Sequence, residues 1–409
     1  MNAAARERIA AFLAQPVLAR LLAALDGEGE ETRVVGGAIR NLLLDEPVSD
    51  VDLATTALPK EAIRRGRAAG FKAVPTGIDH GTVTLVAKGV SFEVTTLRQD
   101  VETDGRRAKV VFGRDFAADA VRRDFTINAL GLDRGGIVHD YCGGLDDLAV
   151  RRIRFIGDAA TRIREDYLRI LRFFRFHARY GEGEPDAEGI AACIAGRDGL
   201  AGLSRERVRA ELLKLLVAPG AATTLQAMAG AGLVVPVIGG VPRLSRFSAI
   251  ADEPGEGVYP VFRLAALAVE VSEDALRLRE RLRLSNAEFE RVSGIAAALE
   301  ALSGREKLPD IARLRRLAHR IGSDAVAGGL VLLGTDGAST EKQALIAELA
   351  QTPPFLPTGK DVLALGVSAG PKIGQILEMA REAWIEVGCP AGREAQLRML
   401  GEAAAGADG

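Results

Sequence analysis

Two aspartates, Asp50 and Asp52, lie two residues apart in the segment VSDVDLAT, whose alternation is typical of a β-strand. Residues two apart on a strand project from the same face, so the two carboxylates are expected side by side. Such neighbours repel each other unless a cation lies between them, and Mg²⁺, which prefers oxygen ligands, suits this pair. An isolated Asp-x-Asp is more often part of an ordinary surface loop, so its surroundings must decide.

A glycine pair and an arginine precede the aspartates. Gly36 and Gly37 follow a short predicted strand, TRVV, and Arg40 lies one turn into the helix predicted to follow. Glycines let backbone N–H groups approach phosphate oxygens, and a helix N-terminus favours negative charge. Arg40 would then neutralise an oxygen of a triphosphate. The alternative is a plain strand–turn–helix corner, which does not explain this arginine.

Glu93 lies within the β-branched segment SFEVTTLR, which with GTVTLVA is predicted to form a hairpin through Lys88 and Gly89. A carboxylate in such a strand is poorly suited to burial without a partner. A metal ion shared with the aspartate pair would supply that partner. The alternative is a glutamate on an edge strand that faces solvent.

Arg123 belongs to the segment VRRDFTINAL, which is predicted to enter a strand that carries Asn128. Its guanidinium has the geometry to clamp a phosphate, with Asp124 as the carboxylate that orients it. A surface ion pair at the start of a strand explains the same residues equally well.

The segment ATRIREDYLRILRFFRFHARYG is predicted to form one long helix. Its apolar stripe is predicted to comprise Tyr167, Ile170, Leu171, Phe174 and Ala178. Asp166 borders that stripe, while Arg169, Arg172 and Arg175 continue around the opposite arc. An ordinary ion pair between Asp166 and Arg169, three residues apart, is one interpretation.

The same two side chains suit the recognition of a base. Cytosine and adenine both present an exocyclic amine beside a ring-nitrogen acceptor. The Asp166 carboxylate accepts from such an amine, and the Arg169 guanidinium donates to the ring nitrogen. Uracil and guanine would leave both side chains unpaired, at a cost of a few kcal/mol. Side chains of the protein would thus replace a template base.

The elements that position these residues form a small α/β head followed by a helical remainder. At 409 residues the chain is expected to form two to four compact units. Hydrophobic residues make up 48% and charged residues 26%, which excludes a disordered chain. From about Ala159 onward the periodicity is helical, and stretches rich in glycine and proline at 237–256 and 351–359 are predicted to join helical units.

Charge and cysteine content set further limits. The net charge is −2, yet nine arginines and only three acids lie between Arg151 and Arg179, so one face suits a polyanion or is simply solvated. Three distant cysteines fit a reducing compartment, and no apolar stretch suggests a signal peptide or a membrane span. The sequence therefore predicts a cytoplasmic protein that does not associate with membranes, and it leaves the oligomeric state open.

Eight segments, in order, resemble the class II tRNA nucleotidyltransferase and bacterial poly(A) polymerase family. They are VVGGAIRNLLL, SDVDLAT, FEVTTLR, DGRRAKVVF, RRDFTINAL, DYCGGLDDL, EDYLRILRFFRF and LSRERVRAELLKLL. The resemblance is close from Val34 to about Leu216 and looser beyond. One departure is Val121, since many relatives carry a glutamate just before the Arg-Arg-Asp triplet.

The resemblance implies an α+β protein with a mixed-sheet catalytic head at 1–150, a helical neck at 151–220, a helical body at 221–350 and a helical tail that contacts tRNA at 351–409. It implies that Asp50, Asp52 and Glu93 bind Mg²⁺ and carry the catalysis. It implies that the nucleotide contacts come from Gly36, Gly37, Arg40, Arg123, Asp166, Arg169, Arg172 and Arg175.

The function implied is addition of CCA to the 3′ end of tRNA from CTP and ATP by two-metal phosphoryl transfer. A poly(A) polymerase shares these motifs, but the pI near 6.2 and the lack of a basic tail disfavour it. A CC-only or A-only enzyme is a further alternative, although the complete segment DGRRAKVVF favours full addition. A non-catalytic RNA-binding protein would not need the clustered carboxylates.

Overall fold

The computed structural model describes residues 2–78, 81–99, 111–251, 260–304, 307–334 and 339–407. They divide into two compact units, Met1–Gly199 and Leu200–Gly409. The first combines a mixed sheet with helices, and the described residues of the second form helices and connecting turns. This confirms the α+β class with a helical remainder. The boundaries at 150, 220 and 350 remain predictions.

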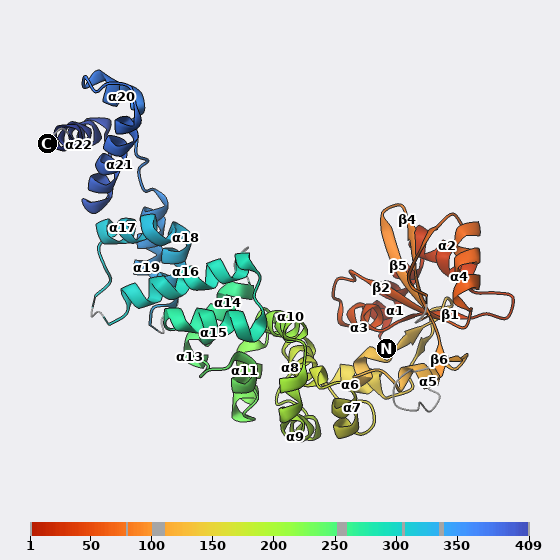
Figure 1. The fold of residues 1–409 in the computed structure, drawn as a ribbon. Coiled ribbons are helices and arrows are strands. Elements are labelled where there is room, and N and C mark those ends of the chain that lie inside the picture. Colours follow the sequence, from red (N-terminus) through yellow and green to blue (C-terminus); the bar gives the residue numbers. More distant parts are fainter. Residues whose placement is uncertain are drawn as a thin grey trace. The chain divides into compact units, whose positions relative to one another are not determined.

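A seven-stranded sheet organises the first unit, in the order β3-β4-β5-β2-β1-β8-β9. Figure 1 labels β1, β2, β4 and β5 of this sheet. Its strands are β1 (Thr32–Val35), β2 (Val51–Thr55), β3 (Lys72–Gly77), β4 (Thr82–Ala87), β5 (Val90–Thr96), β8 (Gly131–Leu132) and β9 (Val138–His139). β2 and β5 pair in parallel, and the other neighbours pair antiparallel. A separate ribbon joins β6 (Arg98–Gln99) to β7 (Val111–Phe112).

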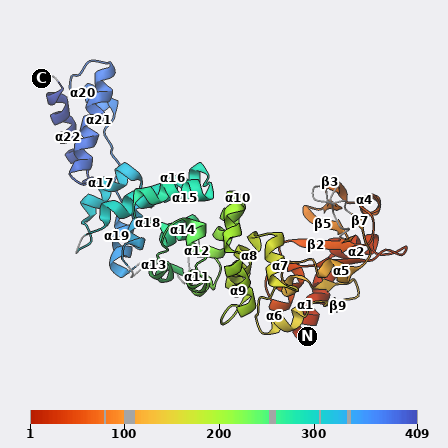
Figure 2. The ribbon, with the colours of Figure 1, turned by 60° about the horizontal axis from the view of Figure 1, so that its bottom comes forward.

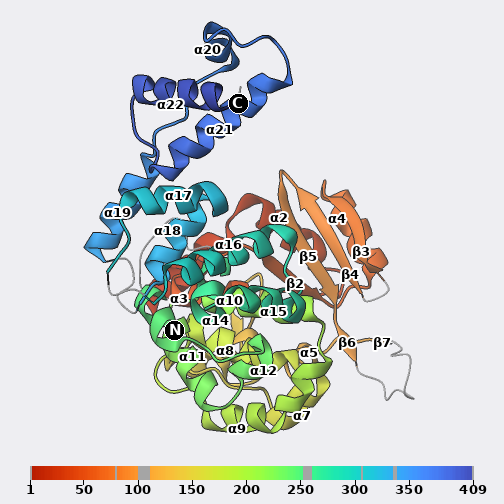
Figure 3. The same ribbon diagram turned by 60° about the vertical axis from the view of Figure 1, so that its left-hand side comes forward.

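Alternation along β4 and β5 divides the sheet into a covered and an open face. Val83, Leu85, Phe92 and Val94 are buried, and α4 (Pro59–Ala68) packs against β3, β4 and β5 beside α2 (Pro16–Leu25), as Figure 3 shows. A Cβ at Gly66 of α4 would lie only 2.8 Å from Leu85, so glycine is required for this close packing. The predicted hairpin between β4 and β5 is confirmed.

The other helices of the first unit surround this sheet or follow it. They are α1 (Ala3–Leu13), α3 (Gly37–Leu44), α5 (Phe116–Ala120), the 3₁₀ turn η2 (Thr126–Asn128), α6 (Gly144–Ala149), α7 (Ala159–Glu165), α8 (Leu168–Tyr180) and α9 (Ala187–Ala195). Asn128 was predicted within a strand, and this prediction is wrong because its segment turns tightly before β8. The Asn128 side chain stabilises that turn by donating to Asp124 Oδ1 at 3.0 Å.

The long helix predicted from Ala159 onward is interrupted at Asp166. This residue has extended backbone angles, φ −155° and ψ 105°, between α7 and α8. Its Oδ1 accepts a hydrogen bond from Leu168 N at 3.1 Å, which satisfies a free amide at the start of α8. Asp166 and Arg169 are therefore not neighbours within one continuous helix.

The second unit is a succession of helices. They are α10 (Arg205–Leu216), α11 (Ala221–Gly230), α12 (Val234–Ile238), α13 (Leu244–Ala251), α14 (Pro260–Ala268), α15 (Ser272–Leu282), α16 (Asn286–Leu302), α17 (Ile311–Ile321), α18 (Ser323–Leu332), α19 (Thr340–Ala350), α20 (Gly359–Ala364), α21 (Pro371–Glu386) and α22 (Arg393–Gly406). The predicted joint at 237–256 contains α13, and residues 252–256 lie outside the described residues. Near the C-terminus, α21 and α22 lie side by side over a core that includes Ile376 and Leu400 (Figure 2).

No single helix in the described ranges has both the length and the apolar composition needed to cross a membrane. The first two helices, α1 and α2, meet those criteria only when taken together, and they bend by 77° where they meet.

Candidate active site

Asp52 and Glu93 lie side by side on the open face of the sheet. They face each other in the register between the parallel strands β2 and β5, and both side chains are exposed. Partial desolvation raises the pKa of Asp52, the nearby carboxylates of Glu93 and Asp50 raise it further, and Arg123 opposes them. A cation between Asp52 and Glu93 would relieve this repulsion.

Asp50 is near this pair but is arranged differently. It precedes β2, so the prediction that both aspartates lie on one strand is wrong for Asp50. Its exposed carboxylate accepts a hydrogen bond from Ser49 Oγ at 2.9 Å. Within the described residues, no group of three or more His, Cys, Asp or Glu side chains is placed to hold a metal ion. The donors Asp52 and Glu93 fit a hard cation, and Asp50 would have to turn toward them to join it.

A cavity of about 370 Å³ opens beside the two carboxylates. Its charged lining consists of Asp52, Glu93, Asp119, Arg98, Arg122 and Arg123. The negative pair suits a cation, and the three guanidinium groups suit an anion with several oxygens. Both requirements are met by a nucleoside triphosphate with its metal ion.

Arg123 lines this cavity but has a different carboxylate partner from the one predicted. Its Nη2 lies 3.3 Å from Asp119 Oδ2, and Arg122 pairs with the same carboxylate at 2.7 Å. Asp124 instead accepts from Arg172, so the predicted orientation of Arg123 by Asp124 is wrong. Because two guanidinium groups share one carboxylate, this wall of the cavity keeps a surplus of positive charge.

Sequence reasoning missed Arg98, Arg122 and Asp119. Arg98 follows β5 on the short strand β6, and no carboxylate among the described residues lies within ion-pair distance of it. Asp119 precedes the two arginines by three and four residues, the spacing of ion pairs on a helix, and this signal was available in the sequence.

The glycine pair makes close approaches to arginine side chains. Gly36 has φ +76°, and a Cβ there would lie 3.0 Å from Nη1 of Arg123. Its amide donates to Leu130 O at 3.1 Å and so helps to join β1 to β8. A Cβ at Gly37 would lie 3.2 Å from Nη2 of Arg40. Both glycines therefore allow an arginine to lie against the turn.

Arg40 is buried, with only 7% of its surface exposed. Its Nη1 donates to Asn128 Oδ1 at 2.5 Å, and its Nη2 donates to the hydroxyl of Tyr180 at 2.7 Å. Burial lowers the pKa of Arg40, as does the nearby Arg175, whereas Tyr180 and Asp124 oppose this. Arg40 is not among the residues that line the cavity beside Asp52.

Arg169, the candidate base-reading arginine, is anchored at one end. Its Nη1 donates to Arg162 O at 2.8 Å and also to the carboxylate of Glu165. Burial of Glu165 opposes its ionisation, but hydrogen bonds from Arg169 and Arg162 outweigh burial and lower its pKa. Asp166 and Arg169 thus lie around the start of α8, with the guanidinium of Arg169 held by the acid next to Asp166.

The remaining two arginines, Arg172 and Arg175, lie on α8. Arg172 Nε donates to Asp124 Oδ2 at 2.8 Å, and the guanidinium of Arg175 lies 4.4 Å from the centre of the Phe176 ring. Burial of Asp124 opposes its ionisation, but Arg172, Asn128 and the amide of Phe125 outweigh burial and hold the pKa low. The contact between Arg172 and Asp124 joins α8 to the segment that follows Arg123, whereas the contact between Arg175 and Phe176 lies within α8.

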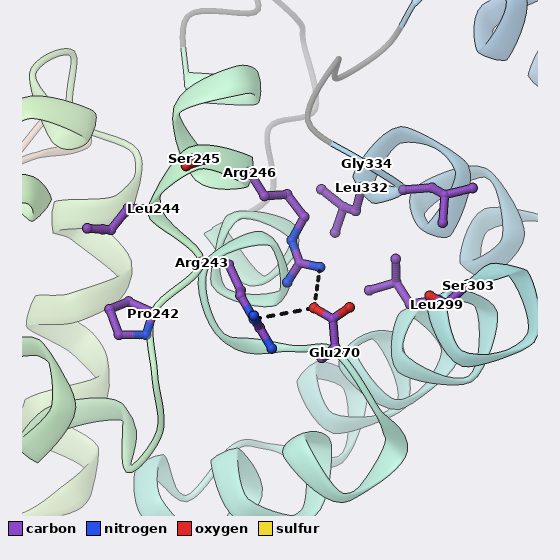
Figure 4. A pocket seen from close by; sticks show the side chains of 11 residues that line it. Pro242, Arg243, Leu244, Ser245, Arg246, Glu270, Leu299, Ser303, Leu332 and Gly334 are labelled. Carbon is purple, nitrogen blue, oxygen red and sulfur yellow. Dashed lines mark hydrogen bonds and ion pairs between the residues drawn. The ribbon is translucent and has the colours of Figure 1, made fainter. Parts of the chain in front are cut away.

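A second cavity, of about 410 Å³, lies in the helical unit and is shown in Figure 4. Arg243 and Arg246 both approach Glu270, with nitrogen–oxygen distances of 3.3 and 3.2 Å. Arg246 is held further by the carbonyl groups of Ala266 and Val269. Among the described residues that line it, Glu270 is the only carboxylate, so this lining does not reproduce the acidic pair of the head.

Two family models match separate parts of this chain. A family model described as "Poly A polymerase head domain" matches residues 32–154. A second, described as "Probable RNA and SrmB- binding site of polymerase A", matches residues 186–245. The first match contains the sheet, both carboxylates and the charged cavity.

Two solved structures resemble the whole chain. The first is the Bacillus stearothermophilus CCA-adding enzyme in complex with CTP, which is 28% identical with a TM-score of 0.72 and covers 98% of both chains. The second is the Thermotoga maritima CCA-adding enzyme complexed with tRNA_CCA, which is 21% identical with a TM-score of 0.72 over 96% of this chain and 97% of the other. At that identity the second likeness concerns the fold alone.

Similarity to curated proteins is stronger. The mitochondrial CCA tRNA nucleotidyltransferase 1 of Mus musculus is 37% identical over 374 residues, which cover 88% of this chain and 84% of the relative. The CCA-adding enzyme of Leuconostoc citreum is 33% identical over 387 residues, which cover 91% of each. Because these identities extend over most of both chains, this chain belongs to the tRNA nucleotidyltransferase family that includes the CCA-adding enzymes.

Proposed function

We propose that this protein adds cytidine, cytidine and adenosine to the 3′ end of tRNA, with CTP and ATP as substrates. The observation that carries the proposal is the similarity, over most of both chains, to relatives named CCA tRNA nucleotidyltransferase and CCA-adding enzyme. The cavity beside Asp52 and Glu93 supports it, since it joins an acidic pair to a basic wall.

The reaction joins the 3′-hydroxyl oxygen of the RNA to the α-phosphorus of the nucleotide. The bond from that phosphorus to its bridging oxygen breaks, and pyrophosphate leaves. Asp52 and Glu93, with Asp50, would hold a divalent metal ion, for which we propose Mg²⁺. Bound there, it would polarise the phosphate and make the hydroxyl a better nucleophile.

The protein's own cations act on the triphosphate. Arg123 and Arg122 share the single carboxylate of Asp119, so they can donate hydrogen bonds to phosphate oxygens without losing that anchor. Arg98 extends this basic wall from β6. Together they offset negative charge that grows on the leaving pyrophosphate.

Replacing Arg98 by alanine is expected to raise the KM for CTP by about 10-fold or more, because a charged hydrogen bond to a phosphate is lost. Steady-state incorporation into tRNA that lacks its terminus measures this effect. Arg114→Ala is the matched control, since Arg114 is an exposed arginine of the same unit that pairs with Glu30. Equal KM values in the two variants would contradict a triphosphate contact by Arg98.

Base selection is assigned to Asp166 and Arg169. The carboxylate accepts from the exocyclic amine of cytosine or adenine, and the guanidinium donates to the ring nitrogen. The contacts of Arg169 Nη1 with Arg162 and Glu165 support this assignment, because they restrict how the guanidinium can turn.

Asp166→Asn is expected to reduce the preference for CTP over UTP by about 10-fold, because an amide offers a donor as well as an acceptor. Competition between the two nucleotides on one tRNA measures this ratio. Glu188→Gln, an exposed carboxylate-to-amide change on α9, serves as the control. A CTP preference that equals that of the control would remove Asp166 from base selection.

One substrate panel separates complete CCA addition from its alternatives. The panel contains tRNA without its terminus, tRNA ending in CC and an unrelated oligonucleotide, each with CTP, ATP or both. Growth that stops after three residues on the first tRNA supports the proposal. Long A-tails on the oligonucleotide would indicate a poly(A) polymerase, and arrest after CC, or addition of A alone, would indicate a partial enzyme. Residues 104–110 of DGRRAKVVF, which favoured full addition, lie outside the described residues.

Two further assignments complete the proposal. The match to an RNA-binding family model and the surplus positive charge of Arg243 and Arg246 support tRNA contact by the helical unit.

The wide separation of Cys142, Cys193 and Cys389, which form no disulfide, supports location in a reducing compartment such as the cytoplasm. Fractionation of cells with an antibody to the protein tests that location.

A further inference from the structure

A closed chain of contacts links the Gly36–Gly37 turn to α8. It begins at Arg40 on α3, whose Nη1 donates to Asn128 Oδ1. The amide nitrogen of Asn128 donates to Asp124 Oδ1 at 3.0 Å. The other carboxylate oxygen of Asp124 accepts from Nε of Arg172 on α8 at 2.8 Å.

The chain closes at the other end of the same helix. Arg40 Nη2 donates to the Tyr180 hydroxyl at 2.7 Å, and its guanidinium lies 4.0 Å from the centre of the Tyr180 ring. The ring of Phe176, halfway between Arg172 and Tyr180 along α8, lies 5.3 Å from each of the two guanidinium groups. One buried arginine therefore contacts α8 directly at Tyr180 and, through two side chains, at Arg172.

The contacts at Arg172 and Tyr180 are far enough apart along α8 to restrain its orientation. Arg172 and Tyr180 are eight residues apart, which corresponds to roughly 12 Å along an α-helix. Two points fixed at that separation restrain both the position and the tilt of α8 relative to the turn. Arg169, near the start of the helix, is carried by the same rigid element.

We propose that Tyr180 and Asn128 are positioning residues: they hold Arg40 so that it fixes α8, and with it the base-reading side chains, relative to the turn and strands that carry the reaction. This inference rests on the proposed function. It assigns to Arg40 a role in joining the triphosphate and base ends of the nucleotide site, in addition to the nucleotide contact predicted from the sequence.

The guanidinium of Arg40 depends on a small number of acceptors. Asn41 Oδ1 also accepts from Arg40, at 3.2 Å from Nε and 3.0 Å from Nη2, so all three guanidinium nitrogens already contact protein oxygens. Removal of the Tyr180 hydroxyl would leave a buried cation short of an acceptor, and such a loss is strongly felt in a site of low polarity. A small displacement of α8 would follow.

The decisive experiment measures the preference for CTP over UTP and the kcat/KM for CTP in Tyr180→Phe. This change keeps the ring that stacks on Arg40 and removes only the hydroxyl. We expect kcat/KM to fall by about 10-fold and the CTP preference to fall by about threefold or more. Tyr141→Phe is the matched control, because Tyr141 also accepts from an arginine of the head, with Arg33 Nη1 at 2.8 Å.

A second variant tests the same contacts from the other side. Asn128→Ala interrupts the link between Arg40 and Asp124, and because both changes act through Arg40, the double variant with Tyr180→Phe should lose less than the product of the separate losses. A CTP preference in Tyr180→Phe equal to that of the wild type or of Tyr141→Phe would overturn the inference. A loss in the double variant equal to the product of the two single losses would also overturn it. The proposed function is tested separately by Asp52→Asn, whose outcome does not depend on Tyr180.

Discussion

Replacing Asp52 by asparagine is expected to lower incorporation of CTP into tRNA by roughly 10³-fold or more, because an amide cannot supply the negative charge that a catalytic metal ion requires. Asp52 is paired with Glu93 in the register of β2 and β5, and the strand β2, VDLAT, contains no second carboxylate that could take its place. Single-turnover incorporation of labelled CTP measures the loss. Asp50→Ala is expected to give a similar loss, because Asp50 is proposed to hold the same ion.

The same variant, Asp52→Asn, is expected to lose activity without losing stability. The pKa of Asp52 is raised by desolvation and by the carboxylates of Glu93 and Asp50, so its ionised form is disfavoured in the fold. A carboxyl group whose pKa is higher in the folded than in the unfolded state contributes stability when the pH is below the unfolded-state pKa. That contribution is lost as the pH rises through the folded-state pKa. At pH 7 the melting temperature of Asp52→Asn should therefore equal or exceed that of the wild type.

Metal addition separates a lost ligand from a damaged fold. Mg²⁺ is expected to raise the melting temperature of the wild type, since an ion that binds the folded state stabilises it, and to have a smaller effect on Asp52→Asn. Asp198→Asn, an exposed aspartate of the same unit, should behave as the wild type in every assay. Full incorporation by Asp52→Asn would show that the reaction does not depend on this carboxylate.

The places of Asp52 and Glu93 within their strands follow from local cues, whereas their role in metal binding stays a prediction. Alternation in β4 and β5, with the Lys88–Gly89 turn between them, places Glu93 on one face of the hairpin. What local pattern cannot give is the parallel pairing of β2 with β5, which brings Asp52 next to Glu93 from 41 positions away in the sequence. The resemblance to the tRNA nucleotidyltransferase family implies that Asp52 and Glu93 bind one metal ion, and this requires the two strands to lie close together.

Arg40 has contacts that local sequence patterns do not predict. Its place one turn after two glycines is typical of a phosphate contact, yet it is buried against Tyr180, which is 140 positions away. Desolvation of a guanidinium is acceptable only when distant acceptors converge on it, and their convergence is a property of the tertiary fold. Similarly, the break at Asp166 depends on a side chain that caps α8, which the apolar periodicity does not reveal.

Replacing Asp124 by alanine is expected to destabilise the protein by roughly 1–3 kcal/mol, because a partly buried ion pair and two further hydrogen bonds are lost. Its side chain is only 10% exposed and accepts hydrogen bonds from Arg172, Asn128 and the amide of Phe125. Asn128 and Phe125 are buried and would lose an acceptor that water replaces poorly, whereas Arg172 is 31% exposed and would keep contact with water. Urea unfolding at pH 7 measures the difference in the free energy of unfolding.

The pH dependence identifies the charge as the cause. Burial would raise the pKa of Asp124, but Arg172 and the two other donors, Asn128 and the amide of Phe125, outweigh it and hold that pKa below its ordinary value. A lowered pKa means that the stabilisation is present above the ordinary value, about 4, and disappears as the pH falls through the value in the fold. The deficit of Asp124→Ala should therefore be largest near pH 7 and shrink in acid. Asp198→Ala should show no such trend, and a deficit below about 1 kcal/mol at every pH would mean that the Asp124–Arg172 pair does not anchor α8.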